Sequence, residues 1–124
     1  MSIFVDDSDL FTIEVHYTEA GENIVILDKP SEKTTTIKMT FKRPNFAVAQ
    51  RLVASSTMTD PNGGQFVNLV SLQNNMMYFL AQSWDVKDLD GKVIELNADS
   101  IGNLRVEIAR GIIGKLVPSV GQIM

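Results

Sequence analysis

The first third of the chain alternates hydrophobic and polar positions. In FTIEVHY, residues 11–17, four apolar side chains from Phe11 to Tyr17 alternate with threonine, glutamate and histidine. In TTTIKMTFK, residues 34–42, the isoleucine, methionine and phenylalanine again occupy every second position. A strand with one covered face shows this alternation, because successive side chains point to opposite sides. We therefore predict a strand in each segment.

A third strand is predicted between these two segments. IVIL, residues 24–27, is a continuous run rich in β-branched side chains, which are typical of strands. TEAGEN separates it from the first strand, and DKPSEK, which contains Pro30, separates it from the last. Because these connections are short, we expect an antiparallel sheet built from about residues 10–42.

The pattern changes to a helical period after Arg43. Pro44 disfavours a helical conformation at the residue before it, and Asn45 is a good N-cap for a helix that follows. Apolar residues from Phe46 to Val53 then recur at helical spacing, which predicts a short first helix. DPNGG, residues 60–64, predicts a loop, because proline and glycine favour turns.

A second helix is predicted from Phe66 to Trp84, where apolar residues lie on one broad face. From Gln65 to Ser83 the sequence contains no charged side chain, whereas a surface helix usually carries several. Two interpretations remain open. Either the helix is buried centrally, or part of it contacts another polypeptide.

The C-terminal part predicts a turn, an extended segment and a last helix. The acidic turn DLDG, residues 88–91, precedes KVIEL, which is typical of a short strand or an extended arm. Residues 97–100 contain several candidate caps for a helix whose apolar face begins at Ile101, and Pro118 should end or kink that helix. The whole pattern predicts one α+β domain over residues 1–124, mainly β over 1–43 and with about three helices over 44–124.

Composition narrows the range of partners. The chain has 124 residues, which is the size of one domain. Its formal charge of -4 repels phosphate, so nucleic acid is not an expected partner. It contains no cysteine, and no apolar run approaches the ~20 residues that span a bilayer. The acidic N-terminus is unlike a secretory signal, so we expect a protein of the cell interior without a membrane segment.

The sequence offers few groups for catalysis or for cofactor and metal binding. If Gly91 took the glycine position of a calcium loop, Val86 and Asn97 would occupy positions that require carboxylates. His16 is the only histidine, and the alternation predicts that it is exposed on the polar face of the first strand, with no serine or carboxylate spaced around it as a catalytic motif. We therefore expect no catalytic residue, no metal and no cofactor.

The C-terminal segment SWDVKDLDGKVIELNADSIGNLRVEIARGIIGKL resembles the tail assembly chaperones of long-tailed bacteriophages. In these proteins a helix ends in a Trp-Asp segment, and an Asp-Gly turn and a short extended arm lead to a final helix. The similarity covers roughly residues 66–117. It implies a non-enzymatic protein of the host cytoplasm that binds the tape measure protein, tail tube subunits or both before the tail polymerises. It also implies that Trp84 anchors the end of the second helix and that the acidic turn is only a connector.

Two alternatives to an assembly chaperone stay open. A small structural virion protein of the tail, baseplate or head completion complex would have the same size and the same lack of catalytic residues. A small enzyme or ligand-binding domain would need a convergent polar pocket on the strand face.

For a chaperone, the expected partner-binding surface lies on the charge-poor second helix and on the last helix. Adaptable thioethers and other apolar side chains there could bind helical segments of a long partner, and a homo-oligomer is compatible with this role. The residues expected to make these contacts are Met76, Met77, Phe79, Leu80, Ile112 and Ile113.

Overall fold

A computed structural model describes residues 2–124 and has the predicted α+β fold. Its main sheet contains four antiparallel strands in the order β2-β1-β3-β6. These strands are β1 (Leu10–Ala20), β2 (Asn23–Leu27), β3 (Thr35–Lys42) and β6 (Ala81–Trp84). The helices are α1 (Phe46–Ser55), α2 (Leu69–Leu80), α3 (Ala98–Gly102) and α4 (Val106–Val120), and a separate two-stranded hairpin consists of β4 (Thr57–Thr59) and β5 (Gln65–Val67).

The three predicted N-terminal strands are confirmed, and their alternation sets the register. Ile13 lies opposite Met39 and Val15 lies opposite Ile37, so the apolar positions of β1 and β3 share one face. Between β1 and β2 the chain reverses at Gly21, whose φ of 67° lies in the left-handed region that glycine adopts without strain. The sheet therefore presents one apolar face and one polar face.

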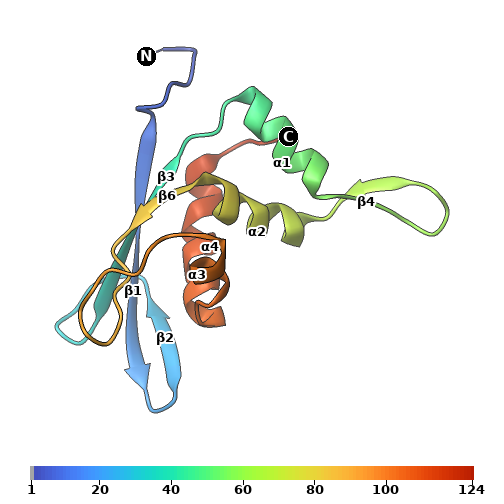
Figure 1. Ribbon diagram of the computed structural model, residues 1–124. Coiled ribbons are helices and arrows are strands. Elements are labelled where there is room, and N and C mark those ends of the chain that lie inside the picture. The colour runs from blue at the N-terminus through green and yellow to red at the C-terminus, as the bar shows by residue number, and fades with distance from the viewer. Residues whose placement is uncertain (1) are drawn as a thin grey trace.

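The long helices pack on the apolar face of this sheet (Figure 1). α4 crosses β1 and β2 so closely that a Cβ added at Gly111 would lie 3.3 Å from side-chain carbons of Val15 and Ile26. α2 packs beside α4 and completes the core. The largest fully buried apolar side chains are Phe41, Met39, Leu52, Met77, Ile112, Leu116 and Val15.

Asparagines begin three of the four helices. The Asn45 side chain accepts a hydrogen bond from the backbone N–H of Val48 at 2.9 Å, as the sequence predicted. Asn97 forms a capping box with Ser100 at the start of α3, which confirms a cap in the predicted segment. Asn68 caps α2 through the N–H of Ser71. These caps satisfy N–H groups that have no partner within the helix.

The second helix is shorter than predicted at both ends. Residues 65–67 pair with β4, and residues 81–84 pair with β3, where Trp84 lies opposite Met39. Helical apolar spacing had extended the prediction over both segments. Residues 65–67 form a local hairpin across the DPNGG turn, and residues 81–84 bond to a strand about 40 residues earlier in the chain. The helical spacing of apolar residues records neither pairing.

The predicted last helix is divided in two. α3 ends at Gly102, and α4 begins only at Val106, so the chain has four helices within residues 2–124 instead of three. Pro118 lies inside α4, two residues before the helix ends at Val120. A proline near the end of a helix is compatible with its termination there. Gly121 follows with a φ of 80°.

The β4–β5 hairpin projects from the body of the protein (Figure 1). Its tip is the predicted DPNGG loop, where the Asp60 carboxylate accepts hydrogen bonds from the N–H groups of Asn62 and Gly64. Gly63 has a φ of 85°, as its turn requires. We call Thr57–Val67 the arm. None of the helices formed by residues 2–124 is both long and apolar enough to cross a membrane.

Candidate interaction surface

The structure does not bring the six expected partner-binding residues together on one surface. Met76, Met77 and Leu80 are each only 2% exposed, and Ile112 is fully buried. These four side chains belong to the hydrophobic core, which corrects the expectation that they face a partner. Apolar residues at helical spacing identify a buried face, but the same spacing cannot show whether the protein's own core or another chain covers it.

The other two residues lie on different sides of α2. Phe79 is 64% exposed and borders a shallow hollow that it shares with Val48, Arg51 and Leu52 of α1. Ile113 is partly buried and lines a groove between α2 and α4. Only the groove combines residues from both of the helices on which a binding surface was expected.

This α2–α4 groove has an apolar floor and exposed apolar walls. Met77, Ile101 and Ile113 contribute to the floor. Val70 on one wall is 65% exposed and Val106 on the other is 60% exposed. Its remaining lining residues are Asn74, Tyr78, Gly102, Leu104, Ala109 and Arg110. Exposed aliphatic side chains that border an apolar hollow form a patch that another molecule can cover.

Charge is nearly absent from this groove. Arg110 is its one charged lining residue among those that the structure describes. No charged residue occurs between Asp60 and Asp85, a segment that includes β5, α2 and β6. A groove with this chemistry suits the apolar face of an amphipathic helix, whose side chains would enter at intervals of three and four residues.

The start of α4, beside the groove, is attached to the β1–β2 turn. The Arg105 guanidinium donates a hydrogen bond to the backbone carbonyl of Glu22 at 2.9 Å and pairs with the Glu107 carboxylate at 3.3 Å. The pKa of Glu107 is lowered, first by a hydrogen bond from its own backbone N–H and also by the charge of Arg105. These contacts join the start of α4 to the β1–β2 turn.

His16 is buried, contrary to the expectation that it is exposed. The connection from Leu27 to Thr35 must cross β1, because β2 and β3 lie on opposite sides of that strand. Since Leu27 lies opposite His16 and Thr35 lies opposite Tyr17, the crossing falls at His16. The imidazole is consequently only 6% exposed, although it lies on the polar face. The alternation of apolar and polar residues in β1 predicted the correct face for His16, but it could not predict that the β2–β3 connection would cover that face.

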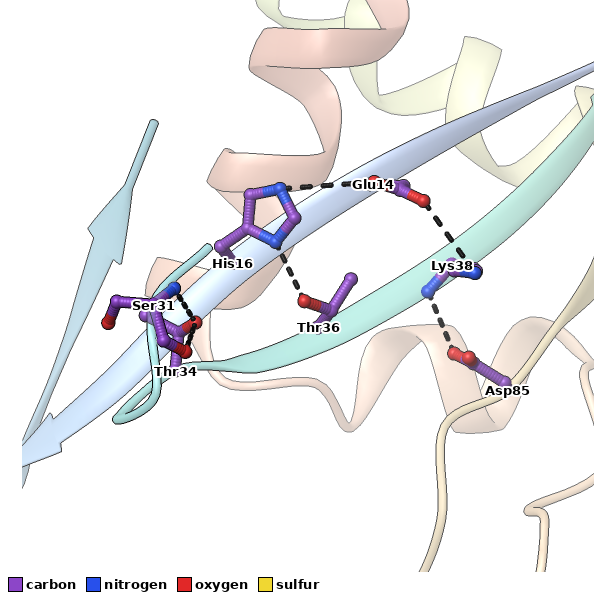
Figure 2. A network of polar contacts seen from close by, with 7 residues as sticks. All are labelled: Glu14, His16, Ser31, Thr34, Thr36, Lys38 and Asp85. Atoms are coloured by element: carbon purple, nitrogen blue, oxygen red, sulfur yellow. Dashed lines mark hydrogen bonds and ion pairs between the residues drawn. The ribbon is translucent and has the colours of Figure 1, made fainter. Parts of the chain in front are cut away.

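The polar groups around His16 are paired with one another (Figure 2). The Nδ1 atom of His16 lies 2.7 Å from Oγ1 of Thr36. The Glu14 carboxylate lies 3.9 Å from Nε2 of His16 and 3.7 Å from Nζ of Lys38. The backbone N–H of Lys38 donates to Asp85 at 2.8 Å. The Glu14–His16 contact lies within β1, whereas the others join β1 to β3 and β3 to the segment after β6, which is a structural role.

The acidic turn connects β6 to α3. The Asp88 carboxylate accepts hydrogen bonds from the N–H groups of Asp90 and Lys92 at 2.9 and 3.0 Å, and Gly91 has a φ of 81°. The indole N–H of Trp84 donates to the carbonyl of Ile94 at 2.7 Å, which fixes the returning segment against the body. Within residues 2–124, no three His, Cys, Asp or Glu side chains converge as a metal site.

The arm adds a second exposed apolar feature. Met58 lies directly opposite Phe66 across the hairpin, and both side chains are exposed. Sequence reasoning placed Phe66 in a helix and missed the hairpin, although two short runs on either side of DPNGG are a hairpin signal. It also missed the groove walls Val70, Tyr78 and Val106, for which the only available signal was the lack of charge.

Comparisons of this chain with protein families, with curated proteins and with solved structures find no match.

Proposed function

We propose that this protein is a tail assembly chaperone of a long-tailed bacteriophage. It binds the tape measure protein in the host cytoplasm, before the tail tube polymerises around that protein, and has no catalytic role. The observation that carries the proposal is the exposed, nearly uncharged α2–α4 groove. The resemblance of residues 66–117 to such chaperones supplies the identity of the partner.

The groove suits transient binding to a long helical partner. The exposed walls at Val70 and Val106 are accessible without unfolding. Apolar contacts of this kind are non-directional, so one groove can accept many similar segments at modest affinity. Met77 in the floor adds a flexible thioether that adapts to side chains of different shape.

Charged substitutions in the groove walls test this proposal. A Val70→Glu, Val106→Glu double variant should fold, because both side chains are exposed, yet should no longer co-purify with the tape measure protein. Phage that carry this variant should form no tails. Leu89→Glu is the matched control, because Leu89 is fully exposed at the tip of the acidic turn and lies outside the groove. Normal tails from a folded double variant would contradict the proposal.

The projecting arm favours a second candidate function, a permanent structural component of the virion. An exposed hairpin with an apolar cross-strand pair, Met58 and Phe66, is suited to contacts between neighbouring subunits. Quantitative protein analysis of purified virions separates the two functions. An assembly chaperone should be absent from them, whereas a structural component should be present at a fixed copy number.

A further inference from the structure

One edge of β1 has no neighbouring strand over its first half. β2 pairs with residues 16–20 of β1 and does not reach residues 10–15, so β1 extends beyond it (Figure 1). The carbonyl of Asp9 accepts a hydrogen bond from Arg43, on the β3 side. Because backbone groups alternate in direction along a strand, those of Thr12 and Glu14 point to the open side. Within residues 2–124, no other strand pairs with them there.

The strand itself carries little of the usual protection against pairing. Natural edge strands are commonly blocked by proline, by lysine, by a bulge or by a covering segment. The sequence of the open segment, LFTIE, contains no proline, and its one charged residue is Glu14. A shallow groove runs beside it, between the strand and the residues Lys115 and Ser119 of α4. An incoming strand therefore has both free backbone groups and space.

We infer that a second copy of this chain occupies the edge. The two β1 strands pair antiparallel around a two-fold axis that passes beside Thr12. In this register Thr12 lies opposite the partner's Thr12, Leu10 lies opposite the partner's Glu14, and Phe11 lies opposite the partner's Ile13. The two main sheets then form one continuous sheet across the dimer.

The side chains on both faces fit this register. On the apolar face, Phe11 stacks on Phe41 within its own chain and would continue that apolar row to the partner's Ile13. On the polar face, Thr12 is hydrogen-bonded to Thr40 at 2.8 Å, so four threonines would form one row across the axis. Glu14, which already pairs with Lys38, would face an uncharged leucine.

A register shifted by one residue fits less well. A shift by one residue would place the apolar side chains of one copy on the polar face of the other, because the side-chain period of a strand is two. The chosen register opposes no like charges, whereas like charges directly opposite would destabilise the pair. An extended peptide of unrelated sequence could use the same backbone groups, but it would lack this self-complementarity. The pairing involves a short segment, so we expect a weak dimer that dissociates on dilution.

Site-specific crosslinking tests the register. The native chain has no cysteine, so a single introduced thiol reports one position. Thr12→Cys should be captured as a dimer by a short bis-maleimide, because directly opposite residues have Cα atoms about 5.5 Å apart. Glu14→Cys is the matched control on the same strand and face. Its two copies would be offset by four residues, or roughly 13 Å, and should not react with each other.

Charge exchange at the axis provides a second test that does not depend on thiol chemistry. Sedimentation of the native chain should show a monomer–dimer equilibrium. Thr12→Lys alone and Thr12→Glu alone should each be monomeric, because like charges would meet at the axis, whereas a mixture of the two should form a heterodimer.

Three results would overturn the inference. One is a native chain that stays monomeric at every concentration up to about 1 mM, well above the range expected even for a weak interface. Another is equal or faster crosslinking of Glu14→Cys. The third is a mixture of the Thr12 variants that remains monomeric while the native chain dimerises. These measurements use no phage protein, so their outcome is separate from that of the tape measure experiment.

Discussion

Trp84 shows how one residue can define the role of its surroundings. Its ring lies in the core opposite Met39, and its indole N–H holds the carbonyl of Ile94. The acidic turn therefore connects these two residues. Its Asp88 carboxylate accepts hydrogen bonds from backbone N–H groups of the turn itself. The prediction that Trp84 is a buried anchor is confirmed, but Trp84 ends strand β6 and not the second helix, which stops at Leu80.

Replacement of Trp84 should strongly destabilise the fold. We expect Trp84→Ala to lower the free energy of unfolding by about 3–5 kcal/mol, because it removes a large buried side chain and leaves a cavity. It also leaves the Ile94 carbonyl without its donor. Urea denaturation followed by circular dichroism measures the change. Leu89→Ala, in the same connector but fully exposed, should change the stability by less than about 0.5 kcal/mol.

At the scale of elements, the packing of α4 on the sheet depends on one of its glycines. A Cβ added at Gly111 would lie 3.3 Å from side chains of β1 and β2, whereas a Cβ added at Gly114 would meet no atom within 4 Å. Both residues occupy the interior of the same helix. Substitutions at the two positions therefore distinguish two effects on stability. One is the intrinsic cost of glycine in a helix, and the other is the need for α4 to pack closely on the sheet.

The two glycine-to-alanine variants should differ. Gly114→Ala should raise the free energy of unfolding by roughly 0.5–1 kcal/mol, because alanine restricts the unfolded chain and favours the helix. Gly111→Ala should gain less or lose stability, since its Cβ would lie 3.3 Å from Val15 and Ile26 and push α4 from the sheet. Paired thermal unfolding curves compare them. Equal stabilisation of both variants would show that the packing of α4 on the sheet does not require glycine at position 111.

At the scale of the whole molecule, the apolar residues fall into two groups with different roles. Met76 is buried between the sheet and the helices, whereas Met58 and Phe66 lie exposed on the arm. The sequence marks all three as hydrophobic positions of a charge-poor region. Burial in the structure assigns the first to folding and leaves the other two available to another chain.

Substitutions in the two groups should change the stability by very different amounts. The free energy of unfolding of a Met58→Ser, Phe66→Ser double variant should differ from that of the native chain by no more than about 0.5 kcal/mol, because exposed positions contribute little to stability. Met76→Ser should lose about 2–5 kcal/mol, as do other large-to-small changes in a core. Chemical denaturation of both variants provides the comparison. A large loss from the arm variant would mean that the arm packs on the body in solution.

Much of the fold follows from the sequence by itself. The alternation in residues 11–17 and 34–42 determined two strands and their buried faces, because a strand side chain can face only one of two sides. The caps at Asn45 and in residues 97–100 were readable for a similar reason, since a cap is a local hydrogen bond between near neighbours.

Only the tertiary structure decided the rest. Residues 81–84 form a strand because they pair with the free edge of β3. His16 is buried because the connection between β2 and β3 passes over it. Met76, Met77, Leu80 and Ile112 became core, while Val70 and Val106 were left exposed around a groove. In each case the deciding contact joins segments far apart in the chain. The periodicity of one segment reports that a face will be covered, but the covering partner is fixed only when the elements pack.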